Sequence, residues 1–521
     1  QEARSWSKTK LIQFCEQESV SESLAILQRL ALEPLATFGE MNKFKETEVV
    51  SDAIRLFSAR NVDSAEGFCN QGKELYLNGK ITEALDLFEK AIIIYPECSK
   101  TLSWKARVLA RMSENEAAID IANQALKFDS GNALAYFSKG LSYHNMKKFQ
   151  KALDWYDQSI ELDPVLCESY NNKGAVLKTL NQFQDALKCF DKAIELDPRY
   201  SAAYHNKGLA LRSIGQLEPA IECYSMAITL NPIQTTAYMN KGNALLLVRK
   251  FREAVECYDE VISRNPTHVR AYSGRGKALE QCNQLHLAVQ SFDKCLEINP
   301  KDVDNLYHKA TILGKLKKYK QSLLLFERII QIQSNHARSH YQKGNILKEM
   351  GRLSEASESY DRAIELNPYD LDALMNKASV LYTLNQYDKA IGYYDQVIKL
   401  NAEYYPAYTN KGLALQNLKK WDKALEWYNQ AIKLNPNDNV AFCNKGNVLE
   451  CLGNSAEALK CFTMAIQLDP QVAEFHMNKG FTLLKMKELK TTFGGEMDRP
   501  HDDGAEDTRM KSSSTNPTVP A

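Results

Sequence analysis

The feature that most constrains this chain is a pattern of residues that returns every 34 positions. In residues 204–232 an aromatic residue is followed by a glycine, then by an alanine, a second aromatic residue, a second alanine and a proline. These residues are Tyr204, Gly208, Ala220, Tyr224, Ala227 and Pro232. The same pattern starts again at Tyr170 and at Tyr238. A fixed period of this length indicates a tandem array of units that bury their apolar faces only by stacking on their neighbours.

Each period contains two sets of residues with helical spacing. In the first set an aromatic residue, a glycine or alanine and a leucine stand at i, i+4 and i+7, which is one face of a helix. In the second set an alanine, an aromatic residue and another alanine have the same spacing. Small residues allow the two helix backbones to approach closely. Asn-Pro or Asp-Pro, as at Pro232, then ends the second helix because proline cannot donate the next hydrogen bond.

In period and pattern the array resembles the tetratricopeptide repeat family. The resemblance implies an all-α fold, a right-handed superhelical α-solenoid of helix-turn-helix repeats. It also implies that the first helix of each repeat lines a concave groove.

The repeats define the expected domain organisation. We expect twelve tandem repeats of 34 residues at 65–472, then a half repeat at 473–490. The eighth repeat departs most from the pattern, with Leu306 in the aromatic position. Residues 491–521 are rich in Gly, Asp, Ser and Pro without hydrophobic periodicity, which predicts a disordered tail. The half repeat either caps the array or marks truncation of a longer one, and the missing initiator Met indicates a fragment or a processed start.

Residues 1–64 lie outside the repeats. Their hydrophobic residues predict two helices separated near Pro34, which we interpret as a helical N-terminal region or cap that shields the first repeat. The order of hydrophobic residues around Pro34 also resembles the helical N-terminal domain of transcription elongation factors, so a second interpretation of this segment stays open.

Charge balance and cysteine content limit the partners and the compartment. Lys plus Arg and Asp plus Glu each number 65, so no overall basic field favours nucleic acid or a membrane surface. The sequence shows no signal peptide and no run of 18 apolar residues, so no transmembrane helix is expected. Stacked helices about 8–10 Å apart hold equivalent cysteines beyond the roughly 7 Å limit for a disulfide. We therefore expect free thiols in an intracellular protein, cytoplasmic or nuclear, including the four that share one repeat position, Cys189, Cys223, Cys257 and Cys461.

No motif predicts catalysis. Gly274 and Gly276 fall inside the first helix of a repeat with no strand before it, so they do not form a phosphate loop. His336 and His340 have i, i+4 spacing but lack the metalloprotease glutamate, and His340 occupies a packing position. We expect no enzymatic activity, no cofactor and no metal site.

The candidate binding residues form a column of asparagines two positions after the first aromatic residue. An Asn amide is both a donor and an acceptor, so it matches the N–H and C=O of an extended peptide whatever the side chains of that peptide. The column lapses at Gly274, His308 and Gln342, which predicts two binding segments. With Asn70 in the first repeat, the predicted peptide-binding residues are Asn172, Asn206, Asn240, Asn376, Asn410, Asn444 and Asn478.

Three functions fit these expectations. We favour a non-enzymatic scaffold that binds extended or disordered segments of other proteins, with neither nucleic acid nor membrane as a partner. A long array with this column also resembles that of the O-GlcNAc transferase family, which implies the substrate-recruiting arm of a glycosyltransferase whose catalytic domain lies beyond residue 521. A chaperone adaptor is the third. Its carboxylate clamp is incomplete here, because Tyr341, Pro406 and Asn410 stand where cations are required around Asn345 and Asn376.

Overall fold

The structure, a computed structural model, describes residues 63–493, with side chains described as far as residue 487. Throughout these residues the regular elements are α-helices, without a strand, which confirms the predicted all-α repeat fold. The predicted N-terminal region and C-terminal tail lie outside the described residues except at 63–64 and 491–493, which are helical.

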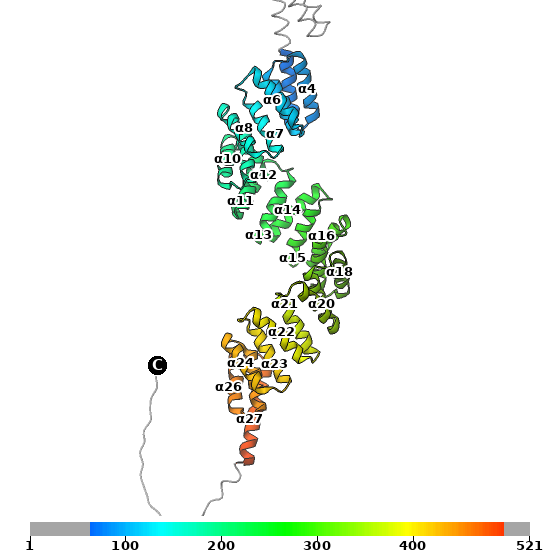
Figure 1. The fold of residues 1–521 in the computed structure, drawn as a ribbon, viewed down its shortest axis with the longest axis vertical. Coiled ribbons are helices and arrows are strands. Elements are labelled where there is room, and N and C mark those ends of the chain that lie inside the picture. The colour runs from blue at the N-terminus through cyan, green and yellow to red at the C-terminus, as the bar shows by residue number, and fades with distance from the viewer. Residues whose placement is uncertain (1–62, 494–521) are drawn as a thin grey trace, which may run out of the picture. The chain divides into compact units, whose positions relative to one another are not determined.

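The helices alternate between a first helix of each repeat, here called an A helix, and a second, called a B helix (Figure 1). The A helices are residues 63–77, α5 (Ser99–Arg111), α7 (Ala133–Asn145), α9 (Cys167–Thr179), α11 (Ser201–Ser213), α13 (Thr235–Leu247), α15 (Val269–Gln281), α17 (Val303–Lys315), α19 (Ala337–Glu349), α21 (Leu371–Thr383), α23 (Tyr405–Asn417), α25 (Asn439–Cys451) and α27 (Ala473–Phe493). The B helices are α4 (Ile81–Ile94), α6 (Asn115–Phe128), α8 (Phe149–Leu162), α10 (Phe183–Leu196), α12 (Leu217–Leu230), α14 (Phe251–Arg264), α16 (Leu285–Ile298), α18 (Tyr319–Ile332), α20 (Leu353–Leu366), α22 (Tyr387–Leu400), α24 (Trp421–Leu434) and α26 (Ser455–Leu468).

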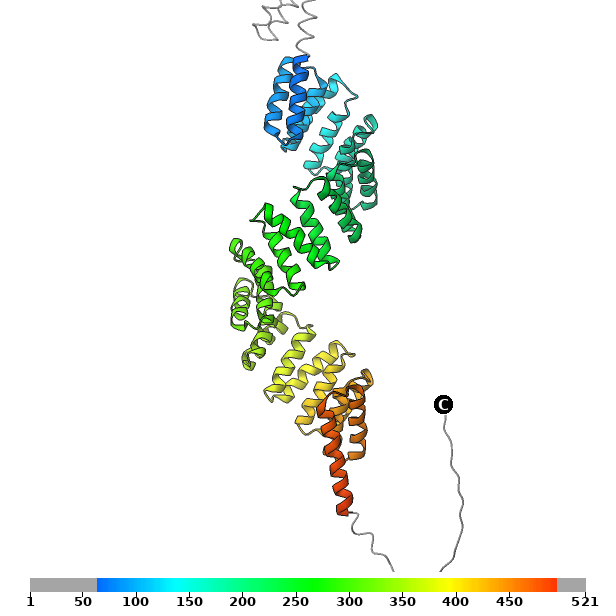
Figure 2. The ribbon, with the colours of Figure 1, turned by 180° about the vertical axis from the view of Figure 1, so that it is seen from behind.

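The chain divides into two compact units, residues 1–298 (unit 1) and residues 299–521 (unit 2). Within each unit the A helices from α5 to α25 pack on their own B helices, and each of these B helices packs on the next A helix of the unit (Figure 2). The A helix of the predicted half repeat, α27, continues to Phe493, past the expected boundary at residue 490.

Glycine on the A helix and an aromatic ring on the B helix form the core of a repeat. A Cβ added to Gly208 would lie 2.6 Å from Cε1 of Tyr224, closer than side chains ever approach. The Tyr224 ring is completely buried. The contact recurs between Gly174 and Phe190 and in other repeats, so the glycine is needed for close approach, as its spacing predicts. At Gly480 of α27 no described atom lies within 4 Å of the added Cβ.

The turn between each A helix and its B helix has one residue in the left-handed region of φ. In unit 1, Gly215 has φ +80° and Arg249 has φ +63°. The amide of the residue after Gly215, Gln216, donates to the Leu211 carbonyl at 3.0 Å, which satisfies a carbonyl at the end of α11. The positions recur at the repeat period and are Gly79, Ser113, Lys147, Asn181, Gly215, Arg249, Asn283, Lys317, Gly351, Asn385, Lys419 and Gly453.

Ion pairs with a constant sequence separation link neighbouring repeats. The cation directly before the small residue of the A helix, a glycine or an alanine, pairs with a carboxylate 16 residues earlier, on the preceding B helix, as in Lys377–Asp361 at 2.6 Å. Further pairs with this separation include Lys105–Glu89, Lys173–Asp157, Lys207–Asp191, Arg275–Asp259, Lys343–Glu327 and Lys411–Asp395. Where Asn123 replaces the carboxylate, Lys139 instead lies over the Trp155 ring, 3.5 Å from its centroid. The pattern of small and aromatic residues does not predict this column of ion pairs.

Candidate functional site

The asparagine column lies on the A helices, which contact one another directly from repeat to repeat. In unit 1, α5 contacts α7 and α9 contacts α11, and in unit 2, α23 contacts α25. The surface made by the A helices of a unit is called its A-face below. Each predicted asparagine therefore lies beside the A helix of the preceding repeat, and its neighbours there decide whether its amide is available.

In unit 1 the predicted asparagines are bound within the protein. Asn172 donates to the Glu168 carbonyl of its own helix at 2.8 Å. Asn206 donates to Oδ1 of Asn171 at 2.9 Å. The Asn240 amide nitrogen lies 2.9 Å from Nε2 of His205, and its oxygen accepts from Arg212 at 3.2 Å.

In unit 2 the column divides into bound and unbound amides. Asn376 donates to the Tyr341 hydroxyl at 3.1 Å and to Oδ1 of Asn345 at 3.3 Å, and accepts from Lys348 at 3.3 Å. Asn478 donates to the Cys443 sulfur at 3.4 Å.

Two half-buried asparagines one repeat apart, Asn410 and Asn444, make no side-chain hydrogen bond to any described residue. The residue 35 positions earlier explains this difference. Beside Asn410 it is Met375, which cannot accept strongly. Beside Asn444 it is Thr409, a buried residue whose hydroxyl donates to Asp438 at 2.7 Å. The side-chain amides of Asn410 and Asn444 therefore lie on the A-face without a hydrogen-bond partner among the described residues.

Two of the other sequence predictions have a structural explanation. Gly274 interrupts the column because a Cβ there would lie 2.5 Å from Cζ of Tyr258, in the preceding repeat. His340 is buried, and its Nε2 lies 3.1 Å from the Ser334 carbonyl oxygen, which agrees with a packing role.

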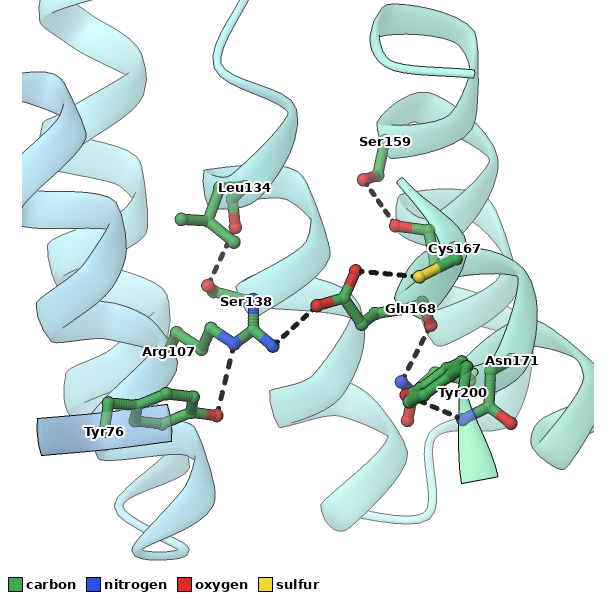
Figure 3. Close-up of polar contacts among 11 residues, drawn as sticks. Tyr76, Arg107, Leu134, Ser138, Ser159, Cys167, Glu168, Asn171 and Tyr200 are labelled. Atoms are coloured by element: carbon green, nitrogen blue, oxygen red, sulfur yellow. Dashed lines mark hydrogen bonds and ion pairs between the residues drawn. The ribbon is translucent and has the colours of Figure 1, made fainter. Parts of the chain in front are cut away.

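Unit 1 contains a pocket of about 340 Å³ on its A-face. In this pocket Arg107 lies between Tyr76 and Glu168 (Figure 3). It donates to the Tyr76 hydroxyl at 3.1 Å and to Glu168 at 3.2 Å, and its guanidinium lies 5.0 Å from the Phe137 ring centroid. Burial opposes the charge, but Tyr76 and Glu168 outweigh burial and raise the pKa of Arg107. At the rim of the pocket, Arg111 is exposed and lies over the Tyr76 ring at 5.2 Å.

The described residues contain neither a metal-binding cluster nor a membrane-spanning helix. Between residues 63 and 487 no group of three or more His, Cys, Asp or Glu side chains is close enough to hold a metal ion. In the same part of the chain no helix has the length and apolar character to cross a membrane. Each described cysteine is a free thiol, and burial raises the pKa of Cys257 to about 11.

Comparison with protein families gives matches along most of the array. One model described as "Tetratricopeptide repeat" matches residues 133–164, 167–200, 201–233, 235–268, 405–438 and 440–472. Two further models with the same description match residues 69–133 and 341–404, and residues 269–302.

The curated relatives are similar over short stretches. The BBSome complex member BBS4 of Mus musculus is 26% identical over 105 residues, which is 19% of this chain and 20% of that protein. The TPR repeat-containing thioredoxin TDX of Arabidopsis thaliana is 28% identical over 93 residues, 18% of this chain and 24% of that protein. The chain thus spans about a quarter or less of the length of these relatives.

Two solved structures have related helical arrays. The APC/C hetero-tetramer Cut9-Hcn1 is 14% identical with a TM-score of 0.37, and covers 80% of this chain and 96% of the matched chain. YrrB, a TPR protein with an unusual peptide-binding site, is 22% identical with a TM-score of 0.33, and the match covers 36% of this chain and 97% of the YrrB chain.

Proposed function

Because the chain belongs to the tetratricopeptide repeat family, we propose that it is a non-enzymatic protein–protein interaction scaffold. Its A-face binds extended segments of partner proteins. The observation that carries the proposal is the pair of half-buried, unbound amides of Asn410 and Asn444 on successive A helices of unit 2.

The spacing of these two amides suits an extended chain. Packed helices lie about 8–10 Å apart, and a strand advances about 3.3 Å per residue. Two equivalent side chains of neighbouring repeats therefore meet peptide groups about three residues apart. Each amide can donate to a carbonyl and accept from an N–H, so recognition is directed at the partner's backbone.

The other predicted asparagines have a different role in this proposal. Asn206, Asn240 and Asn376 each bond to the A helix of the preceding repeat. These three hold neighbouring repeats in register, and their loss affects stability first. The column thus serves both the scaffold and the partner. Asn172 bonds to its own helix, and for the other asparagines the residue 35 positions earlier decides whether the amide is bound or is left for a partner.

We place the protein inside the cell. The support is that each described cysteine is a free thiol, Cys451 at an exposed position included. Exposed thiols are typical of reducing compartments, where disulfides rarely persist.

The test starts from a random library of 12-residue peptides selected for binding to the full chain. Dissociation constants are then measured by fluorescence anisotropy for the wild type and for Asn410→Ala combined with Asn444→Ala. Leaving peptide groups unpaired costs about 1–3 kcal/mol each, so we expect the double variant to bind at least about tenfold more weakly at unchanged melting temperature. The control, Asn206→Ala with Asn240→Ala, should lose stability and retain these peptides. A library that yields no peptide, or peptides that bind the double variant as tightly, would refute the proposal.

A further inference from the structure

A second column on the A-face of unit 1 carries positive charge. The last turns of three successive A helices, α7, α9 and α11, place His144, Lys178 and Arg212 at the same repeat position. Arg111 follows one position later in the last turn of α5. No comparable run of basic residues exists at this position further along unit 1, where α13 has Leu246 and α15 has Glu280.

Side-chain contacts place this column beside the asparagine column. Arg212 donates to Oδ1 of Asn240 in the next repeat at 3.2 Å. In unit 2 the equivalent residue, Lys348, makes the equivalent bond to Asn376 at 3.3 Å. The cations of the column therefore project onto the same A-face as the predicted peptide-binding asparagines.

Lys178, Arg212 and Arg111 have no carboxylate partner among the described residues. The nearby carboxylate on the A-face is Glu168, and it is bound to Arg107 at 3.2 Å. Lys178 makes no hydrogen bond or ion pair to the described residues, although it is half-buried. Arg212 bonds to an amide, and Arg111 lies over a ring.

The electrostatic consequences are visible in the neighbouring groups. Burial and then the charge of Arg212 lower the pKa of Lys178. Burial, Lys178 and Arg212 lower the pKa of His205, and burial and Lys178 lower the pKa of His144. The Nδ1 atom of His144 is buried and has no hydrogen-bond partner among the described residues. This part of the A-face is thus a partly desolvated cluster of like charges.

The position of the cations at helix ends does not account for the cluster. A cation in the last turn is favourable because it offsets the negative end of the helix dipole. That benefit is available to an exposed cation such as Lys127, in the last turn of the B helix α6. It requires neither burial nor the alignment of cations from successive repeats.

We propose that the A-face of unit 1 binds an acidic, extended segment of a partner protein, with carboxylates three residues apart meeting Lys178 and Arg212. The distance of about 8–10 Å between neighbouring A helices equals about three residues of extended chain at about 3.3 Å each. Arg111 lies on α5, two repeats before the helix α9 that carries Lys178. It meets a further carboxylate of the same segment. The inference rests on the proposed function, and names the chemistry of one class of partner.

The experiment uses two labelled 12-residue peptides of identical composition and the full chain. One peptide repeats Asp-Ala-Ser four times, and the other begins with four Asp residues followed by the Ala and Ser residues. We expect the spaced peptide to bind more tightly, with an affinity that falls as salt is raised. Lys178→Glu with Arg212→Glu should weaken it about tenfold or more, and the neutral pair Lys178→Gln with Arg212→Gln should weaken it less.

Two controls make the test specific. Lys127→Glu also places a negative charge at the C-terminal end of a helix, and so has the same unfavourable interaction with the helix dipole. Lys127 lies on a B helix, so this variant should bind the spaced Asp peptide with unchanged affinity. A peptide with Lys in place of Asp should bind the charge-reversed variant better than the wild type. Any of three results would overturn the inference. These are equal affinity for the two Asp peptides, unchanged affinity of the charge-reversed variant for the spaced Asp peptide, and preferential binding of a single-stranded oligonucleotide. If the Asp peptides fail this test while the library peptides that depend on Asn410 and Asn444 still bind, the proposed function stands and this inference fails; if neither class binds, both fail.

Discussion

Replacing a tightly packed glycine, Gly208, and an exposed one, Gly392, by alanine tests how a repeat is packed. At Gly208 an added Cβ lies 2.6 Å from Cε1 of Tyr224, whereas ordinary carbon contacts begin at about 3.5 Å. The completely buried ring or the helix must then move by about 1 Å. At Gly392, in the interior of α22, nothing lies within 4 Å and the position is exposed.

The two alanine variants should therefore differ in their effect on local stability. Alanine gains about 1 kcal/mol over glycine in a helix interior, so Gly392→Ala should stabilise α22. Overpacking costs about 1–3 kcal/mol, which cancels or exceeds the same gain in Gly208→Ala. The expected difference between the two sites is about 1–3 kcal/mol, or about 5- to 150-fold in an opening equilibrium.

Hydrogen exchange read by mass spectrometry measures this locally, which matters because repeat arrays need not unfold in one step. Peptides from α11 and α12 should exchange faster in Gly208→Ala, and peptides from α22 should exchange more slowly in Gly392→Ala. Equal stabilisation at both sites would show that Gly208 is not in close contact with Tyr224 and would refute the packing argument.

Three further predictions follow from the described contacts. Lys377→Met removes the buried cation paired with Asp361 and should lower the local stability of α21. The loss should be only about 1 kcal/mol, because the half-exposed Asp361 carboxylate regains water. The control Lys192→Met, which removes an exposed ion pair, should leave hydrogen exchange unchanged. Burial, Lys178 and Arg212 lower the pKa of His205 below its unfolded value of about 6.5, so stability from the neutral ring is present above that pH and is lost as the pH falls. Melting at pH 7.5 and 5.5 should show this loss in the wild type and less of it in His205→Gln. Arg249→Gly relieves a left-handed φ of +63° and should raise the local stability by up to about 1 kcal/mol, whereas no gain would mean that the φ is not strained.

Much of the helical packing is readable from the sequence, because one steric requirement repeats in every unit. Gly208 and Tyr224 stand 16 residues apart and meet for the same reason as Gly174 and Phe190. The inter-repeat ion pairs were missed because their partners lie on different repeats. A search for opposite charges at a constant separation would have found pairs such as Lys377 and Asp361.

The availability of the candidate site could not be predicted from its own column. Asn376 and Asn410 are the same residue at the same repeat position. Asn376 is bound because Tyr341 offers a hydroxyl, and Asn410 is unbound because Met375 does not. Thr409 beside Asn444 appears suitable in sequence, and only the structure shows its hydroxyl committed to Asp438 at 2.7 Å.

The central claim is that partner segments contact the free amides of the A-face in unit 2. The most direct measurement is the nuclear magnetic resonance spectrum of the asparagine side-chain amides in selectively labelled full chain, recorded with and without a selected library peptide. The account predicts shifts for Asn410 and Asn444, and smaller shifts for Asn206 and Asn240, whose amides are already bonded. Shifts confined to asparagines of the B helices, such as Asn429, with Asn410 and Asn444 unmoved, would contradict it.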